Sequence, residues 1–283
     1  MASFTNFATL SYNGGTTNSN IVTGEILEAL TAVKTAVSAN YSAGDRITYA
    51  LSLVNTGTAA ITDYTVTDNL GGYTVGANTV YPLAYNAGTV RYYINGVLQA
   101  APTVTAGPPL TVTGLTVPAG GSAVLIYETT ATPVAPLATG SSITNTATIT
   151  GGGLTTPITA QATVETANSA DLTISKALSP TTVTENGQIT YTFVISNTGN
   201  TEATAADNVV VTDTFAPILR NIAVTYNGTA WTEGANYTYN AATGVFTTLA
   251  GQITVPAATF TQNTDGTFTV TPGTTTLVIT GTV

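Results

Sequence analysis

Apolar and polar residues alternate along short segments of the chain, and polar turns separate these segments. In residues 45–57, Asp-Arg-Ile-Thr-Tyr-Ala-Leu-Ser-Leu-Val-Asn-Thr-Gly, every second residue from Ile47 to Leu53 is apolar. This period of two predicts a strand with one face in a core, closed by an Asn-Thr-Gly turn. Threonine, valine, isoleucine and tyrosine favour strands, and glycine and proline favour turns. The pattern therefore predicts an all-β protein.

The second half of the chain repeats the first. Residues 187–199, Gly-Gln-Ile-Thr-Tyr-Thr-Phe-Val-Ile-Ser-Asn-Thr-Gly, match residues 45–57. Tyr-Thr-Val-Thr-Asp at 64–68 likewise recurs as Val-Val-Val-Thr-Asp at 209–213, after a short insertion. A repeat of this length is a whole domain rather than a solenoid unit, so we expect two tandem domains.

The last strand of the first copy has no counterpart after the second copy. Ile-Thr-Asn-Thr-Ala-Thr-Ile at 143–149 follows the apolar strand 123–127, whereas the sequence reaches Val283 soon after the corresponding strand 276–280. A sandwich without this strand exposes an apolar groove and unpaired N–H and C=O groups. We therefore expect the second domain to lack its closing strand.

The N-terminal segment has the pattern of the missing strand. Phe-Thr-Asn-Phe-Ala-Thr-Leu at 4–10 matches residues 143–149, and glycines follow both segments. The match predicts a donor strand that completes the second domain of another copy of the chain, because open sheet edges accept added strands. Such a head-to-tail contact propagates as a filament unless it closes a ring. The inserted face would carry Phe4, Asn6, Ala8 and Leu10. The alternatives are a tail at residues 1–12 that only resembles a strand, or an arbitrary end of the sequence at Val283.

These motifs together resemble the conserved repeat domain of bacterial and archaeal surface proteins. The resemblance rests on Ile-Thr-Tyr with Asn-Thr-Gly, on Val-Thr-Asp and on the closing Ile-Thr-Asn-Thr-Ala-Thr-Ile strand, and it covers nearly the whole chain. It implies immunoglobulin-like sandwiches used as a spacer or stalk. We expect a donor strand or hairpin at residues 1–20, a complete immunoglobulin-like domain at 21–166 and an incomplete one at 167–283.

Composition and charge argue against several functions. Asp, Glu, Lys and Arg make up 7% of the 283 residues and the net charge is −9, whereas nucleic acids and anionic membranes attract clustered Lys and Arg. The chain has no Cys and no His, the residues of disulfides, of many metal sites and of most general bases. We expect no metal, no cofactor and no turnover enzyme.

The sequence also points to a location outside the cell or on a cell or spore surface. No apolar run is long enough to span a bilayer, and the N-terminal residues show no recognisable secretory signal. Either a leader has been removed or the protein leaves the cell by another route.

Charged and amide residues occupy inward positions on the predicted strands. Side chains alternate between the two faces of a strand, so a polar residue two positions from apolar ones shares their face. The inward polar residues form two matching sets: Lys34, Asp68 and Asn145 in the first domain, and Lys176, Asp213 and the donor-strand residue Asn6 for the second. An isolated charge in a core is costly, so both sets need an explanation.

Covalent chemistry gives that explanation. Burial favours the neutral amine of a lysine and the protonated form of an aspartic acid. The amine can then attack the asparagine carboxamide while the acid moves the protons and ammonia leaves. This arrangement resembles the self-formed isopeptide bonds of Gram-positive pilin and collagen-adhesin domains. The alternative is a buried lysine–aspartate salt bridge capped by the asparagine.

The resemblance implies one bond inside the chain and one between chains. Lys34 would join Asn145 with Asp68 as the proton shuttle, and Lys176 would join Asn6 of the next subunit with Asp213 in that role. Glu128, on the strand before the closing one, is the other acid of the first domain, but its counterpart in the second copy lies near a glycine.

The predicted function is a structural subunit of an extracellular filament, pilus-like or spore-associated, whose partners are identical subunits. The alternative is a monomeric adhesin or stalk module. It would bind a host glycan or protein through loops such as 71–90 or 229–245.

Overall fold

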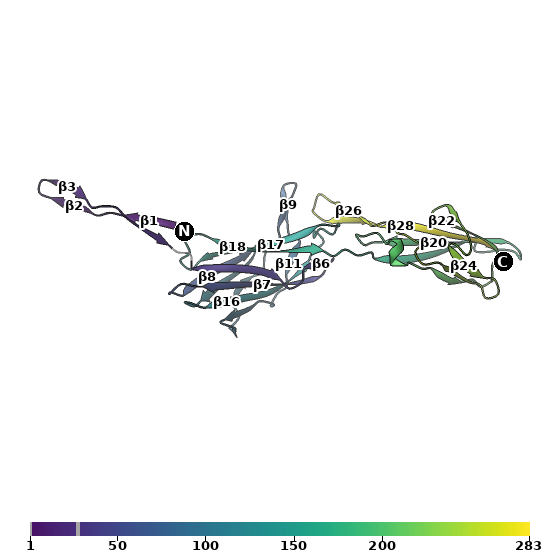
Figure 1. The fold of residues 1–283 in the computed structure, drawn as a ribbon, viewed down its shortest axis with the longest axis horizontal. Helices are drawn as coiled ribbons and strands as arrows, with labels where there is room; N and C mark the ends of the chain where they lie inside the picture. The colour runs from purple at the N-terminus through teal and green to yellow at the C-terminus, as the bar shows by residue number, and fades with distance from the viewer. Residues whose placement is uncertain (1, 27–28) are drawn as a thin grey trace. The chain divides into compact units, whose positions relative to one another are not determined.

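The structure is a computed structural model that describes residues 2–26 and 29–283, and it confirms the all-β class. The chain forms two compact units, each a sandwich of antiparallel strands of the immunoglobulin type (Figure 1). One unit holds the chain up to Ala135 together with Ser142–Glu165, and the other holds Pro136–Ser141 and Thr166–Val283.

Two six-stranded sheets build the first unit. One has the order β13-β12-β16-β7-β5, with β11 also pairing with β16; its strands are β5 (Leu30–Ala36), β7 (Arg46–Asn55), β11 (Leu83–Tyr85), β12 (Arg91–Ile94), β13 (Val97–Leu98) and β16 (Ser122–Ala131). The other has the order β14-β15-β8-β17-β18-β6; its strands are β6 (Asn40–Tyr41), β8 (Ile61–Asp68), β14 (Thr103–Thr105), β15 (Leu110–Val117), β17 (Ser142–Gly151) and β18 (Ile158–Thr166). A small hairpin joins β9 (Tyr73–Val75) to β10 (Asn78–Val80).

Alternate side chains of both sheets form the core of the first unit. Strand β7 buries its inward residues Ile47, Tyr49, Leu51 and Leu53, and β17 buries Ile143, Asn145, Ala147 and Ile149. Strand β7 ends in the predicted turn, where Asn55 Oδ1 accepts a hydrogen bond from the N–H of Gly57 at 2.9 Å. The period-two pattern of the sequence is therefore confirmed on both strands.

The second unit repeats the five-strand path β13-β12-β16-β7-β5 of one sheet, without a counterpart of β11 among its described strands, and repeats the other sheet only in part. Its five-stranded sheet has the order β19-β20-β28-β22-β23, with β19 (Leu172–Ser179), β20 (Gln188–Asn197), β22 (Arg220–Tyr226), β23 (Thr229–Trp231) and β28 (Gly273–Thr282). Its three-stranded sheet has the order β21-β25-β24, with β21 (Thr212–Thr214), β24 (Tyr237–Asn240) and β25 (Val245–Thr248). The hairpin β26 (Thr259–Gln262) and β27 (Phe268–Thr271) and the 3-10 turn η1 (Ala205–Asp207) complete the described elements.

The part that the second unit lacks corresponds to β17 and β18. Strand β8 pairs with β15 on one side and with β17 on the other. Its counterpart β21 carries the same Val-Thr-Asp motif, but among the described strands it pairs with β25 alone. One edge of β21 is therefore open, as expected for a domain without its closing strand.

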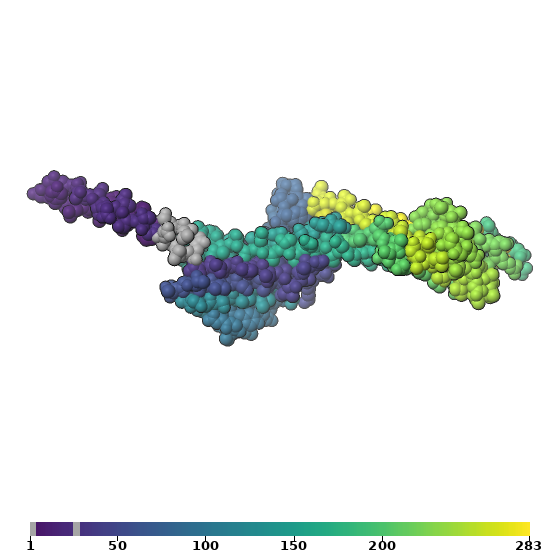
Figure 2. Space-filling view, in the orientation of Figure 1, coloured from purple at the N-terminus to yellow at the C-terminus, as the bar shows by residue number. Residues whose placement is uncertain are grey.

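The N-terminal segment is a hairpin, one of the two forms expected for residues 1–20, but it extends to Ile26, and residues 4–10 do not form one continuous strand. Strand β1 (Ala2–Asn6) pairs with β4 (Val22–Ile26), and β2 (Thr9–Tyr12) pairs with β3 (Gly15–Asn18). The registers of the two pairs differ by one residue, and this bulge interrupts the predicted strand at Phe7 and Ala8. The hairpin is the purple segment of Figure 2, and the face seen there is open to solvent.

Candidate functional site

The first unit brings Lys34 and Asp68 into direct contact between its two sheets. Lys34 lies on β5 and Asp68 ends β8, and Lys34 Nζ is 2.5 Å from Asp68 Oδ2. Their side chains are 0% and 1% exposed, so both lie in the core as the alternation predicted. The other carboxylate oxygen of Asp68 accepts a hydrogen bond from the N–H of Leu70 at 3.0 Å.

Two tyrosines that were not singled out from the sequence surround this pair. Tyr127 on β16 donates its hydroxyl hydrogen bond to Asp68 Oδ2, and Lys34 Nζ lies 4.8 Å from the ring centroid of Tyr49 on β7. The faces of aromatic rings attract a cation, and the rings also exclude water. Both tyrosines occupy inward positions of alternating strands, so the period of two was the signal that could have found them.

Asn145 completes the site from the neighbouring strand. The Cα of Ala147 pairs with that of Asp68, so Asn145, two residues earlier on β17, shares the inward face with Asp68. Asn145 is 0% exposed, and neither its Oδ1 nor its Nδ2 has a hydrogen-bond partner. A buried amide without partners costs about 1–3 kcal/mol. No hydrogen bond of ordinary geometry explains why an asparagine occupies this position, although its side chain is close enough to the Tyr49 and Tyr127 hydroxyls to act on their pKa values.

The electrostatics of the site favour a reactive amine. Burial lowers the pKa of Lys34 to about 8, although the Asp68 carboxylate and its hydrogen bond act in the opposite direction. A pKa of about 8 leaves roughly a tenth of the lysine neutral at pH 7, far more than for a solvated lysine. Burial also raises the pKa of the Tyr127 and Tyr49 hydroxyls, and Asn145 opposes part of both increases. Both tyrosines therefore remain protonated near neutral pH.

The second unit repeats the lysine–aspartate contact in an open environment. Lys176 Nζ on β19 lies 2.5 Å from Asp213 Oδ2 on β21 and 4.4 Å from the ring centroid of Tyr191. The side chains of Lys176 and Asp213 are 40% and 17% exposed, so the prediction that both are buried is wrong for the isolated chain. The physical reason is the open edge of β21, which no described strand covers.

The position of Tyr127 marks a second difference between the units. Tyr127 pairs with Tyr49 across β16 and β7, and the corresponding pair on β28 and β20 is Ile279 with Tyr191. Asp213 therefore lacks the tyrosine hydroxyl bond that Asp68 accepts.

An apolar cleft extends along the exposed lysine strand. In β5, Leu30 and Lys34 are buried, but every residue of β19 from Thr173 to Ser179 is exposed. Leu172, Thr173, Ile174, Ile195, Val209, Val210 and Val211 line a cleft of about 170 Å³. In the first unit, β17 covers the corresponding side of β8. The cleft thus lies where a closing strand would pack.

Asn6 and the other donor-strand residues are exposed on the N-terminal hairpin. Phe4 is 54% exposed and Leu10 is 63% exposed, and the Asn6 and Ala8 side chains are also exposed. The structure gives the Asn6 carboxamide no hydrogen bond within the described residues. Its pairing with Lys176 concerns two copies of the chain and stays a prediction.

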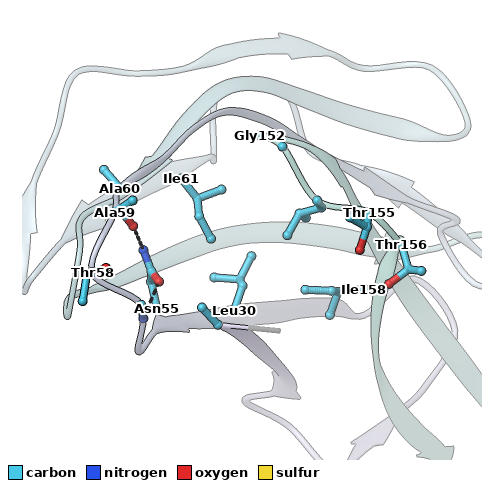
Figure 3. Close-up of a pocket in the computed structure, with 14 residues that line it drawn as sticks. Leu30, Asn55, Thr58, Ala59, Ala60, Ile61, Gly152, Thr155, Thr156 and Ile158 are labelled. Carbon is cyan, nitrogen blue, oxygen red and sulfur yellow. Dashed lines mark hydrogen bonds between the residues drawn. The ribbon is translucent and has the colours of Figure 1, made fainter. Parts of the chain in front are cut away.

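A pocket of about 350 Å³ in the first unit is the other candidate site (Figure 3). Leu30, Ile61 and Ile158 point into it, and Asn55 supplies an amide to its wall. Asn55 Nδ2 donates to the carbonyl of Ala59 at 2.8 Å, so its own turn uses this amide. None of the described residues that line the pocket is charged.

Other site chemistry was also searched for in the described residues. They contain no group of three or more His, Cys, Asp or Glu side chains placed to hold a metal ion. No helix in that part of the chain is long and apolar enough to cross a membrane. Glu128, the alternative acid, lies 3.5 Å from Arg46 NH1, and the Arg46 side chain is 75% exposed. This places Glu128 in a surface ion pair rather than beside Lys34.

Comparisons with known proteins find likeness in fold alone. No protein-family model matches the chain, and no curated protein sequence matches it. The pilus backbone RrgB of Streptococcus pneumoniae is 14% identical with a TM-score of 0.36; the match covers 86% of this chain, which spans only 55% of that structure. BcpA, the major pilin subunit of Bacillus cereus, is 14% identical with a TM-score of 0.35, over 96% of this chain and 73% of that one. A collagen-binding domain of a Staphylococcus aureus adhesin is 11% identical with a TM-score of 0.31, over 49% and 99%.

Proposed function

We propose that the chain is the structural subunit of an extracellular filament, pilus-like or spore-associated. The N-terminal segment of one subunit fills the open cleft in the second unit of the next. One observation carries this proposal: Lys176 and Asp213 repeat the contact of Lys34 and Asp68 without the strand that covers it, and residues 4–10 have the sequence of that strand.

The cleft and the donor segment have complementary properties. The open edge of β21 offers unpaired N–H and C=O groups, and main-chain bonds to an added strand give affinity. Phe4 and Leu10 are exposed in the isolated chain, and fully burying such a side chain contributes about 1.5–3 kcal/mol. Aligning residues 4–10 with residues 143–149 sets Ala8 opposite Asp213 and turns Asn6 towards Lys176, as Asn145 is turned inward beside Asp68.

The geometry of the first unit supports a covalent lock. The neutral amine of Lys34 attacks Cγ of Asn145, and the Asp68 carboxylate, which lies beside Nζ, takes up the proton that the amine loses. A C–N bond forms to Nζ, the bond from Cγ to Nδ2 breaks, and Asp68 carries the amine proton to the leaving ammonia. The product is an uncharged amide. It removes both the buried ammonium and the unsatisfied Nδ2 atom.

The same reaction between subunits joins Lys176 to Asn6, with Asp213 as the proton shuttle. This reaction can occur only after two subunits have assembled, because Asn6 belongs to the donor segment of another copy. The resulting polymer is covalent and contains no disulfide. Each bond forms once, so the chain is not a turnover enzyme.

The test is the assembly state of the purified protein. Wild-type chains should form filaments by electron microscopy and sediment as polymer, whereas deletion of residues 1–12 should leave soluble monomers with unchanged circular dichroism. A wild-type protein that stays monomeric at high concentration would overturn the filament and favour the adhesin or stalk module. Filaments formed normally by the deletion variant would show that the donor segment is not needed.

A further inference from the structure

The gap in the second unit has the width of two strands. In the first unit, β17 and β18 both lie between β8 and the short edge strand β6. By the repeat, the counterpart of β6 is residues 182–183, which form no strand. Tyr41 of β6 is 0% exposed, whereas its counterpart Val183 is 38% exposed. A single strand added beside β21 would leave the other side of the gap, at residues 182–183, uncovered.

Strands β1 and β4 of the N-terminal hairpin reproduce part of the two missing strands in sequence and in register. Strands β17 and β18 pair Ser142 with Glu165 and Thr144 with Thr163, and strands β1 and β4 pair Ser3 with Glu25 and Thr5 with Thr23. The residue types are identical in both pairs. Asn145 is paired with Ala162 in the same way as Asn6 is paired with Val22. The match in residue types and pairing therefore holds for β4 as well as for β1.

The inward face of the hairpin is also arranged for a core. Phe4 pairs with Gly24 where the first unit pairs Ile143 with Val164. A Cβ atom on Gly24 would lie 2.3 Å from Cζ of Phe4, so the aromatic ring covers the glycine. Phe4 therefore fills this part of the inward face from β1 alone, because its ring lies over Gly24. In the first unit, the branched residues Ile143 and Val164 fill the same place from both strands.

We infer that the cleft of the second unit takes the whole hairpin of a second copy, with residues 4–10 on the side of β21 and β4 on the side of residues 182–183. The inference rests on the proposed function and changes the donor from one strand to two. Strand β4 is followed along the chain by β5, as β18 is followed by β19. The two-strand donor therefore repeats between subunits the connection that joins the two units within one chain.

Neighbouring residues of β4 provide the test. Val22 shares the inward face with its partner Asn6, and Thr23 lies on the outward face with its partner Thr5. Both are exposed in the isolated chain, so arginine is tolerated equally at either position before assembly. Val22→Arg should slow filament formation, measured by sedimentation at fixed times, by at least about tenfold relative to Thr23→Arg, because it buries a charge.

Ala8→Arg, on the first donor strand, separates this inference from the proposed function. If Ala8→Arg blocks assembly while Val22→Arg and Thr23→Arg differ by less than about threefold, the donor is one strand and the two-strand inference is wrong. If Ala8→Arg assembles like the wild type, donor-strand assembly itself is wrong. Circular dichroism of each variant confirms that the two units remain folded.

Discussion

Lys34 and Lys176 place their Nζ atoms at the same 2.5 Å distance from an aspartate oxygen, yet their side chains are 0% and 40% exposed. Both sites contain the same lysine–aspartate contact, but a closing strand covers only the first. In the first unit the cover is β17, with Asn145 on its inward face. In the second unit no described strand supplies this cover, and under the proposed function it comes from another molecule. The two sites should therefore react at different times.

The first prediction concerns the bond within the first unit. The variant without residues 1–12, which cannot donate its strand, should have an intact mass lower than its sequence mass by one ammonia. Adding Asn145→Ala to this variant should restore the full sequence mass. Because the bond closes a long loop, its loss should lower the free energy of unfolding by about 4 kcal/mol, and reducing agents should have no effect. A folded sample with unmodified mass would rule out the bond.

The second prediction is that this bond forms faster at higher pH. The lowered pKa of Lys34, about 8, means that the neutral amine becomes the main form above that pH. The rate, followed by intact mass after refolding, should rise about tenfold per pH unit below pH 8 and level off above it. A rate that falls over this range would contradict the neutral amine as nucleophile.

The Asn145→Ala variant provides a matched control for this pH dependence. Its lysine cannot react, and its pKa moves from 10.5 in the unfolded chain to about 8 in the folded one. Between these values the unfolded chain binds more protons, so the free energy of unfolding should rise with pH. Denaturant titrations between pH 8 and 10.5 measure this slope.

The third prediction tests the tyrosine beside Asp68. Tyr127→Phe keeps the ring but removes the hydroxyl that donates to Asp68 Oδ2. Without this bond Asp68 should be held less well for proton transfer, so ammonia loss should be slower while the fold persists. Because the second unit has Ile279 at this position, the bond between subunits should form more slowly than the wild-type internal bond. Time-resolved intact mass and gel ladders compare the two rates.

The fourth prediction separates strand insertion from covalent locking. In Lys176→Ala or Asn6→Ala, the apolar donor residues can still enter the cleft, so filaments should assemble. These filaments should dissociate to monomers after boiling in detergent, whereas wild-type filaments should give a ladder of multimers. Asp213→Ala should behave in the same way, because losing the proton shuttle slows the reaction without closing the cleft.

Peptide mapping identifies the bond directly. Digestion of wild-type filaments should release a branched peptide that joins Lys176 to Asn6. A detergent-resistant ladder that persists in all three variants would refute the assigned chemistry.

Much of this architecture was predictable because a period of two is a local property. The alternation in residues 45–57 placed Ile47 and Tyr49 in the core, and the same rule turned Lys34, Asp68 and Asn145 to one interior. The repeat of the Val-Thr-Asp motif then located Lys176 and Asp213 as a second pair, and the structure brings them into contact.

The rest depended on relations between distant segments. Exposure of Lys176 follows from a strand that the second unit does not contain, and alternation alone cannot report what covers a face. The extent of the hairpin was missed, and residues 21–26 were assigned to the first domain, because β4, with Val22 and Gly24, lacks an alternating apolar pattern and is stabilised by its pairing with β1. Tyr127 was missed because its hydroxyl acquires a role only when β16 faces β8.

The single partner of β21 has a consequence for the finished filament. Each chain contributes one hairpin and one cleft, so an unclosed polymer always keeps an empty cleft at one end and a free hairpin at the other. The two ends are chemically different. A molecule that anchors the filament by the cleft end must present a strand pair, whereas one that binds the opposite end must present an open sheet. In the proposed filament, polarity is therefore determined within each subunit, and the anchoring molecule determines which end is free at the tip.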